Sequence, residues 1–289
     1  MSEVQGQGQG LGPPDALAAT AGHPAKAGRV HERLVEACGP RIWRSHAAPL
    51  DELIATVLSQ HTSDVNSARA FQSLRRAFPT WDHVLAAGVD EIAAAIRVGG
   101  LAGVKAPRIK ACLAGLAERY GVLSLDFLAD LSIAEARSIL EAIPGVGPKT
   151  AACVLLFSLG RPALPVDTHV HRVSERLGLV PPGASPEQVE RQLEAQLPPK
   201  AYYAFHVNLI AHGRRTCRTQ RPRCEACPLS DLCDYRLAAD GHQSGAAGPE
   251  TRSGAPSRRG RGFGGVRRGS PPGAGPESWH STSSSDELE

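Results

Sequence analysis

The chain has 289 residues, of which 42% are hydrophobic and 4% aromatic, and its formal net charge is +3. Because no run of ~18 apolar residues occurs, a membrane-spanning helix is excluded. The N-terminus has no basic segment followed by an apolar one, so we expect no secretory signal. A total charge of +3 is too small, by itself, to indicate a nucleic-acid partner.

The two ends of the chain differ from the rest in composition. Residues 1–28 and 238–289 contain 17 of the 30 glycines and few large apolar side chains. Such segments cannot bury enough apolar surface to offset their ordering entropy, so we expect both to be disordered and residues 29–237 to fold. Residues 251–270 hold six arginines and no acid, which fits a nucleic-acid-binding tail and a solubilising tail equally well.

Apolar residues recur at helical spacing in the middle of the chain. They do so over residues 50–58, directly after Pro49, and again over residues 109–117. The second pattern has Pro107 near its start and Gly121 after its end, as helix boundaries often do. Both patterns predict amphipathic helices.

Further helix starts are predicted from their capping residues. Ser132 followed by Glu135 matches a capping box ahead of a helix over residues 133–143, and Ser185 followed by Gln188 marks another start. The segment 29–237 shows no sustained alternation of β-branched residues and no Asn-Gly or Asp-Gly hairpin signal. The predicted fold class is therefore all-α.

A glycine-containing turn is predicted between two helices, one ending near Ile143 and the next beginning near Pro148. Gly145 and Gly147 allow positive φ and close backbone approach. Free N–H groups of the turn and of the following helix would then form an anion site suited to a phosphate. The turn alone fits an ordinary αα-hairpin equally well.

Two charged residues near this turn are candidates for chemistry. Lys149 lies in the first turn of the second helix, where the dipole disfavours a cation and so favours a partly neutral amine. Asp167 precedes another helix, whose stripe includes Val170, Val173 and Leu177. An aspartate there is most often an N-cap, and a solvated surface position is the ordinary alternative for the lysine.

Four of the seven cysteines fall within seventeen positions, at Cys217, Cys224, Cys227 and Cys233. This clustering favours one metal or cluster site in a reducing compartment over disulfides. Zinc is the alternative to an iron–sulfur cluster, although zinc sites more often use two Cys-x-x-Cys pairs. The loop is basic, with five arginines against two acids, which suits phosphate contact. The other cysteines are expected to be buried without a ligand role: Cys38, Cys112 and Cys153.

Three elements together resemble the endonuclease III family of helix-hairpin-helix DNA glycosylases. They are Leu140–Ala152 with its Gly-Val-Gly-Pro-Lys, the Val-Asp-Thr-His around Asp167, and the four-cysteine spacing. The matches extend from about Arg29 to Arg236. The resemblance implies a [4Fe–4S] cluster on the four cysteines and a two-lobed helical fold. One lobe would contain residues 43–161, and the other residues 29–42 with 162–237, with the active site in the cleft between them.

The resemblance also implies the chemistry. Lys149 would attack the sugar C1′ of a damaged nucleotide, release the base, form a Schiff base and lead to β-elimination, while Asp167 stabilises positive charge on the sugar. The substrate implied is an oxidised pyrimidine in duplex DNA, cleaved during base excision repair. A monofunctional glycosylase and a non-catalytic helix-hairpin-helix DNA-binding protein are the alternatives.

Several DNA contacts are implied by the same resemblance. A flipped base leaves a gap that a wedge must fill; either Gln60 or His61 is a candidate for one wedge, and Leu101 for a second, apolar one. The remaining DNA-binding candidates are Gly145, Gly147, Thr150 and His169. We expect a monomer that acts on DNA inside the cell, in the cytoplasm or at the nucleoid if the source is bacterial.

Overall fold

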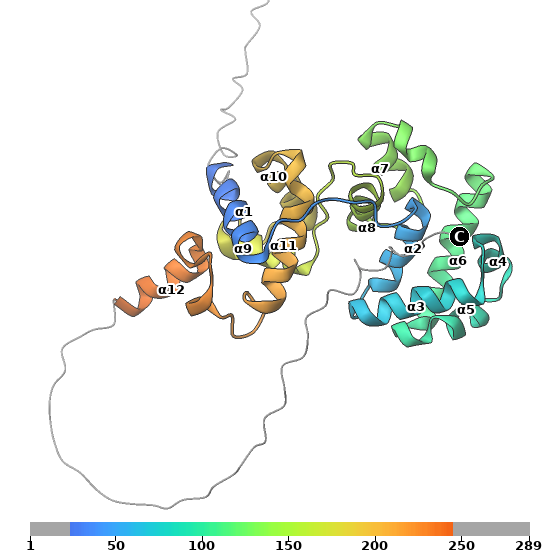
Figure 1. The fold of residues 1–289 in the computed structure, drawn as a ribbon, viewed down its shortest axis with the longest axis horizontal. Coiled ribbons are helices and arrows are strands. Elements are labelled where there is room, and N and C mark those ends of the chain that lie inside the picture. The colour runs from blue at the N-terminus through green and yellow to red at the C-terminus, as the bar shows by residue number, and fades with distance from the viewer. Residues whose placement is uncertain (1–23, 245–289) are drawn as a thin grey trace, which may run out of the picture. The chain divides into compact units, whose positions relative to one another are not determined.

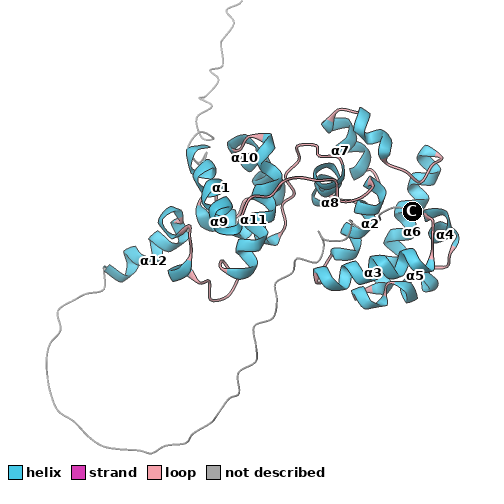
Figure 2. Cartoon of the chain, in the orientation of Figure 1, coloured by secondary structure: helices cyan, strands magenta, loops and turns pink. Residues whose placement is uncertain are grey.

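The computed structural model describes residues 24–244. Within that range the chain is helical, with no strand (Figure 2), and this confirms the predicted all-α class. The α-helices are α1 (Pro24–Cys38), α2 (Pro49–Ser59), α3 (Asp64–Ala77), α4 (Trp81–Ala86), α5 (Val89–Ala95), α6 (Ala102–Tyr120), α7 (Ile133–Glu141), α8 (Pro148–Cys153), α9 (Thr168–Leu177), α10 (Pro186–Gln196), α11 (Tyr202–Arg215) and α12 (Asp234–Ser244).

Short helical turns connect several of these helices. The 3₁₀ turns are η1 (Arg97–Gly99), η2 (Asp126–Asp130), η4 (Pro199–Ala201), η5 (Cys224–Ala226) and η6 (Ser230–Leu232), and η3 (Val154–Ser158) is a π-helix that continues α8. None of the helices in the described range is both long and apolar enough to cross a bilayer.

The described chain divides into two compact units. One is Trp43–Pro165, and the other combines residues 24–42 with Val166–Ala238. In the first unit α2 is surrounded, because it packs against α3, α6, α8 and η3. In the second, α1 packs against α10 and α11, and α9 packs against the same two helices. The N-terminal helix of this unit thus lies beside helices from far along the sequence (Figure 1).

The predicted capping residues form the expected hydrogen bonds. The Ser132 hydroxyl accepts a hydrogen bond from Glu135 N, and Glu135 Oε2 accepts one from Ser132 N. Ser185 and Gln188 make the same reciprocal pair at the start of α10. Pro49 begins α2, and α6 ends at Tyr120, with Gly121 as its C-cap at a left-handed φ of 70°. These boundaries follow from local chemistry.

Two predicted helix boundaries are wrong. Helix α6 begins at Ala102, so Pro107 lies inside it rather than near its start. The reason is packing: Lys105 and Ala106 are buried and extend the packed face of the helix upstream of the proline. Helix α7 ends at Glu141, and Ile143 N instead donates to Leu140 O in a tighter turn.

The expected tail boundaries also need correction. Helix α1 begins at Pro24, and Ala27 is fully buried, so residues 24–28 belong to the folded chain. At the other end, α12 continues past residue 237 to Ser244. The predicted disorder of residues 1–23 and 245–289, including the arginine-rich stretch 251–270, concerns segments outside the described residues.

Candidate active site

The turn between α7 and α8 is held in shape by its backbone. Gly145 has φ of +81°, a left-handed conformation that favours glycine. Gly147 has φ of −102° and ψ of 177°, which any residue can adopt. Of the two glycines that allow positive φ, Gly145 is therefore the one that adopts it. Val146 N donates to Ile143 O at 3.0 Å, closing the turn.

Helix α8 begins at Pro148, as predicted, and places Lys149 in its first turn. The lysine side chain is half-buried, whereas Thr150 is 4% exposed and Ala151 is fully buried. Because Thr150 is buried, its DNA contact stays a prediction, for which its backbone N–H is the candidate donor. That N–H lies among the first helical donors, which lack intrahelical acceptors.

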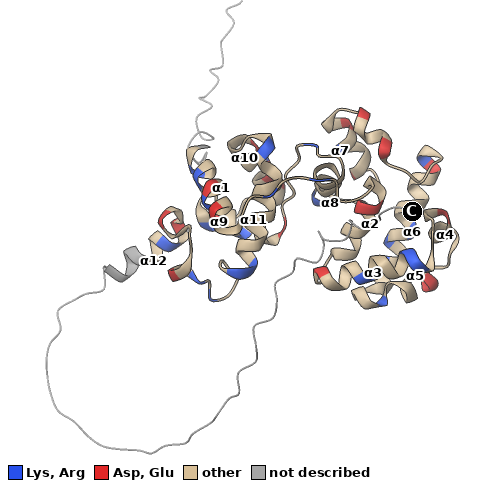
Figure 3. Cartoon of the chain, in the orientation of Figure 1, with Lys and Arg blue, Asp and Glu red and all other residues tan. Residues whose placement is uncertain are grey.

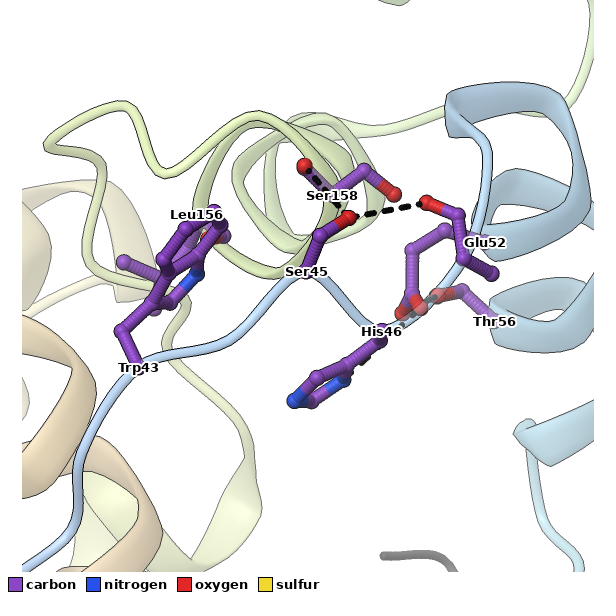
Figure 4. Close-up of polar contacts among 8 residues, drawn as sticks. Trp43, Ser45, His46, Glu52, Thr56, Leu156 and Ser158 are labelled. Carbon is purple, nitrogen blue, oxygen red and sulfur yellow. Dashed lines mark hydrogen bonds and ion pairs between the residues drawn. The ribbon is translucent and has the colours of Figure 1, made fainter. Parts of the chain in front are cut away.

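Glu52 of α2 is an acid near this lysine that sequence reasoning missed. Its side chain is 14% exposed. Its carboxylate accepts from Thr56 Oγ1 at 3.3 Å and lies 3.9 Å from His46 Nδ1 (Figure 4). Burial raises the pKa of Glu52 to about 7, while the Thr56 hydroxyl and the charge of Lys149 act to lower it. Glu52 and Lys149 therefore interact electrostatically within one unit.

Asp167 is the N-cap of α9, as its sequence position predicted. Its Oδ1 accepts from His169 N at 2.9 Å and from Val170 N at 2.7 Å. Arg172 Nη2 lies 3.0 Å from His169 Nδ1 and also donates to Gly213 O. The first turn of α9 is therefore rigidly attached to α11.

Two arginines of α9 hold the start of the cysteine loop. Arg172 Nε and Nη2 donate to Cys217 O at 3.2 and 3.0 Å. Arg176 Nη1 donates to Arg218 O at 2.7 Å and to Cys217 Sγ at 3.4 Å. The sequence alone did not single out these arginines. Figure 3 shows basic residues at the end of α11 and in the loop that follows it, as the arginine count predicted.

The four clustered cysteines line one pocket, together with the apolar side chains of Val173 and Leu177. Burial, with smaller contributions from the other three thiols of the group, raises the pKa of the Cys227 thiol to about 11. All four cysteines of the predicted ligand set thus line the same pocket, but within the described residues their side chains do not form a group that could hold a metal ion. Of the remaining cysteines, Cys112 and Cys153 are buried as predicted, whereas the prediction is wrong for Cys38, which is only partly buried.

The candidate wedge residues lie in two loops of the unit Trp43–Pro165. His61 and Leu101 are exposed and both have φ of 53°. Gln60 is half-buried, and its Oε1 accepts from Arg108 Nη1 at 3.0 Å. Of the two candidates for the polar wedge, His61 is the one whose side chain is exposed at the loop tip.

Comparisons with known proteins identify relatives of this chain. A family model for the HhH-GPD superfamily base excision DNA repair proteins matches residues 54–199. The chain is 36% identical over 206 residues to endonuclease III of Thermotoga maritima, which is 71% of this chain and 92% of that protein. It is 37% identical over 202 residues to endonuclease III of Escherichia coli K12, which is 70% of this chain and 90% of that protein.

The chain belongs to the endonuclease III family of helix-hairpin-helix DNA glycosylases. An Arabidopsis thaliana protein named as a putative DNA glycosylase is 42% identical over 194 residues, which is 64% of this chain and 66% of that protein. Among solved structures, a trapped covalent intermediate of endonuclease III with DNA matches with a TM-score of 0.64 at 30% identity, covering 75% of this chain and 98% of that one. The family model includes the hairpin and Asp167, whereas the cysteine loop lies beyond it.

The raised pKa of Glu52 predicts a pH dependence of stability in this family member. Because its pKa of about 7 lies above the ordinary value of 4.5, the folded chain holds a proton on Glu52 that the unfolded chain has already lost. The stability that this proton provides is fully present below pH ~4.5 and is lost as the pH rises through about 7. Full loss amounts to about 3 kcal/mol.

Glu52→Gln stays neutral at all pH values and should not show this loss. Between pH 5 and pH 8, the free energy of unfolding of the variant in urea should rise by about 2.5 kcal/mol relative to that of the wild type. Glu118→Gln, at an exposed position of α6, is the matched control and should follow the wild type within ~0.5 kcal/mol. Parallel profiles for Glu52→Gln and the wild type would contradict the burial of an ionisable Glu52.

Proposed function

We propose that this DNA glycosylase is bifunctional, and that it excises oxidised pyrimidines from duplex DNA and then cleaves the abasic site. The observation that carries the proposal is Lys149, a half-buried amine directly after the Gly145–Pro148 turn. A related structure is a trapped covalent intermediate of endonuclease III with DNA, which supports a covalent mechanism. The substrate preference rests on the likeness to the endonuclease III relatives.

The reaction follows from the chemistry of a neutral amine. The Lys149 nitrogen attacks C1′ of the damaged nucleotide, and the base leaves with the bonding electrons. One proton of the resulting ammonium passes to the departing base. The nitrogen lone pair then breaks the C1′–O4′ bond, O4′ takes a proton from water, and a protonated Schiff base is left. Removal of a C2′ proton expels the 3′ phosphate by β-elimination, and water releases the lysine. Asp167 stabilises the positive charge on the sugar in the first step.

The hairpin and the two exposed loop tips supply the proposed DNA contacts. Backbone N–H groups of Gly145, Gly147 and Thr150 bind a phosphate without regard to sequence. His61 takes the place of the flipped base and Leu101 is the apolar wedge. The imidazole of His169, anchored by Arg172, contacts the DNA backbone near Asp167.

We further propose a [4Fe–4S] cluster on Cys217, Cys224, Cys227 and Cys233. In such a cluster each thiolate binds a different iron, so the ligands need to surround a volume; that all four cysteines line one pocket supports the assignment. The spacing, with one Cys-x-x-Cys rather than two, supports the cluster over zinc. Bound there, the cluster would hold the basic loop in one conformation for phosphate contact.

Borohydride trapping tests the nucleophile. Wild-type protein incubated with duplexes that carry an oxidised pyrimidine, an abasic site or an undamaged base should give a covalent adduct with the first two. Lys149→Ala should lose the adduct, because the attacking amine is removed, while Lys200→Ala, at an exposed lysine of η4, should retain it. Base release without an adduct would indicate a monofunctional enzyme, and binding without base release a non-catalytic protein.

Asp167→Asn separates the capping role of Asp167 from its charge. Asparagine caps helices about as well as aspartate, so the free energy of unfolding should change by less than ~0.5 kcal/mol. Single-turnover excision should fall by about 100-fold or more, because the carboxylate charge is lost. Asp167→Ala, which removes the cap as well, should also cost about 1 kcal/mol of stability. If Asp167→Asn excises the base at the wild-type rate, Asp167 caps the helix and has no part in the reaction.

Metal analysis tests the cluster. Purified protein should contain about four irons and four acid-labile sulfides per chain and absorb visible light. Cys224→Ala should lose the iron, whereas Cys38→Ala, at a cysteine outside the loop, should keep it. Stoichiometric zinc without iron in the wild type would overturn the assignment.

A further inference from the structure

Two exposed residues of the unit Trp43–Pro165 have an unusual backbone conformation. His61, between α2 and α3, and Leu101, between η1 and α6, both have φ of 53°. Left-handed φ is uncommon for residues other than glycine, and it persists where the surroundings enforce it. Leu101 is nevertheless 53% exposed. What enforces these two conformations must therefore lie beneath the loop tips.

Lys105 lies beneath both tips. It is 2% exposed. Its Nζ donates to Leu58 O at 2.7 Å, to Thr62 Oγ1 at 2.6 Å and to Gly99 O at 3.1 Å. A lysine ammonium has three N–H donors, and here each has an acceptor. Two of the acceptors flank His61 in the chain, and the third precedes Leu101.

The two loops also contact each other through these groups. Thr62 Oγ1 lies 2.6 Å from Gly99 O, to which it donates. Lys105 N donates to Leu101 O at 2.9 Å, so the lysine holds this loop by its backbone as well as its side chain. Arg108, one turn further along α6, donates to Gln60 Oε1. One face of α6 thus ties both loops together.

Packing alone does not explain why this buried residue is a lysine. Burying a charge costs free energy unless it is hydrogen-bonded, and an apolar side chain of similar length would fill the same volume without that cost. Burial accordingly lowers the pKa of Lys105. The side chain is explained by the three bonds that its ammonium makes, all of which go to the two loops.

We propose that Lys105 is a positioning residue that couples the two loops, so that His61 and Leu101 enter a DNA duplex as one unit when a base is flipped. This inference rests on the proposed function, because it concerns how the wedges act. The partner is duplex DNA, and the coupled step is base flipping rather than the chemistry at Lys149.

Lys105→Met tests the proposal, since it keeps the length of the side chain and removes the donors. Lys110→Met is the matched control: it lies on the same helix, and its Nζ donates to Ala87 O, away from the two loops. Base unstacking is followed by the fluorescence of 2-aminopurine beside the lesion. Schiff-base trapping is measured in parallel on single-stranded abasic DNA, which needs neither flipping nor gap filling.

Lys105→Met should lower the flipping signal and duplex excision by tenfold or more, and change single-stranded trapping by less than twofold. Lys110→Met should leave the flipping signal, duplex excision and single-stranded trapping within twofold of the wild type. If Lys105→Met reduces single-stranded trapping as much as duplex excision, or leaves flipping intact, the proposal is wrong. Failure of the wild type to trap on any abasic DNA would instead overturn the proposed function.

A double-mutant cycle tests the coupling directly. The effects of His61→Ala and Leu101→Ala on flipping should be non-additive in the wild-type background, because each tip depends on the other. They should become additive when Thr62→Val removes the hydroxyl that bridges Lys105 and Gly99 O. If Lys105→Met does not fold, Thr62→Val replaces it as the variant that tests the coupling of the two loops. Additive effects in the wild type would overturn the coupling.

Discussion

Helix α6 supports most of the candidate DNA-binding elements of its unit from one face. At helical spacing along that face, Lys105 binds both exposed loops, Arg108 binds Gln60, and Cys112 Sγ donates to Pro144 O at 2.9 Å, at the start of the hairpin turn. A Cβ at Gly115 would lie 3.0 Å from Pro144 Cδ, so glycine lets the turn approach the helix closely. Because a helix is rigid over this length, the distances between the wedges and the hairpin are set by α6.

Helix α9 has a similar role in the other unit. Asp167 caps its first turn, and further along the same helix Arg172 and Arg176 bind carbonyl groups of the cysteine loop. A change in the conformation of that loop would therefore act on the helix that carries Asp167. Through this connection the proposed cluster would act on the conformation of the unit, with no part in the chemical step.

Much of this organisation could be predicted from local patterns. The helix after Pro49, the two capping boxes, the start of α8 at Pro148 and the N-cap at Asp167 all depend on residues within one turn of each other. Where the prediction was wrong, packing had overridden a local signal: buried residues of α6 extend that helix upstream of Pro107. Glu52 was missed because it lies opposite the apolar stripe of α2, where a surface position is expected. Helix α2 is surrounded by other helices, so that its second face is also covered.

The sequence by itself determined the all-α class, the family, the hairpin with Lys149 and the spacing of the four cysteines. These features are carried by short motifs and by periodicity, which depend on neighbours in the chain. Only the tertiary structure decided that Glu52 is buried near Lys149, that Gln60 is held by Arg108 while His61 is exposed, and that Lys105 joins two loops. Each of these depends on contacts between residues far apart in the chain, and burial of a polar side chain becomes visible only when the helices that cover it are in place.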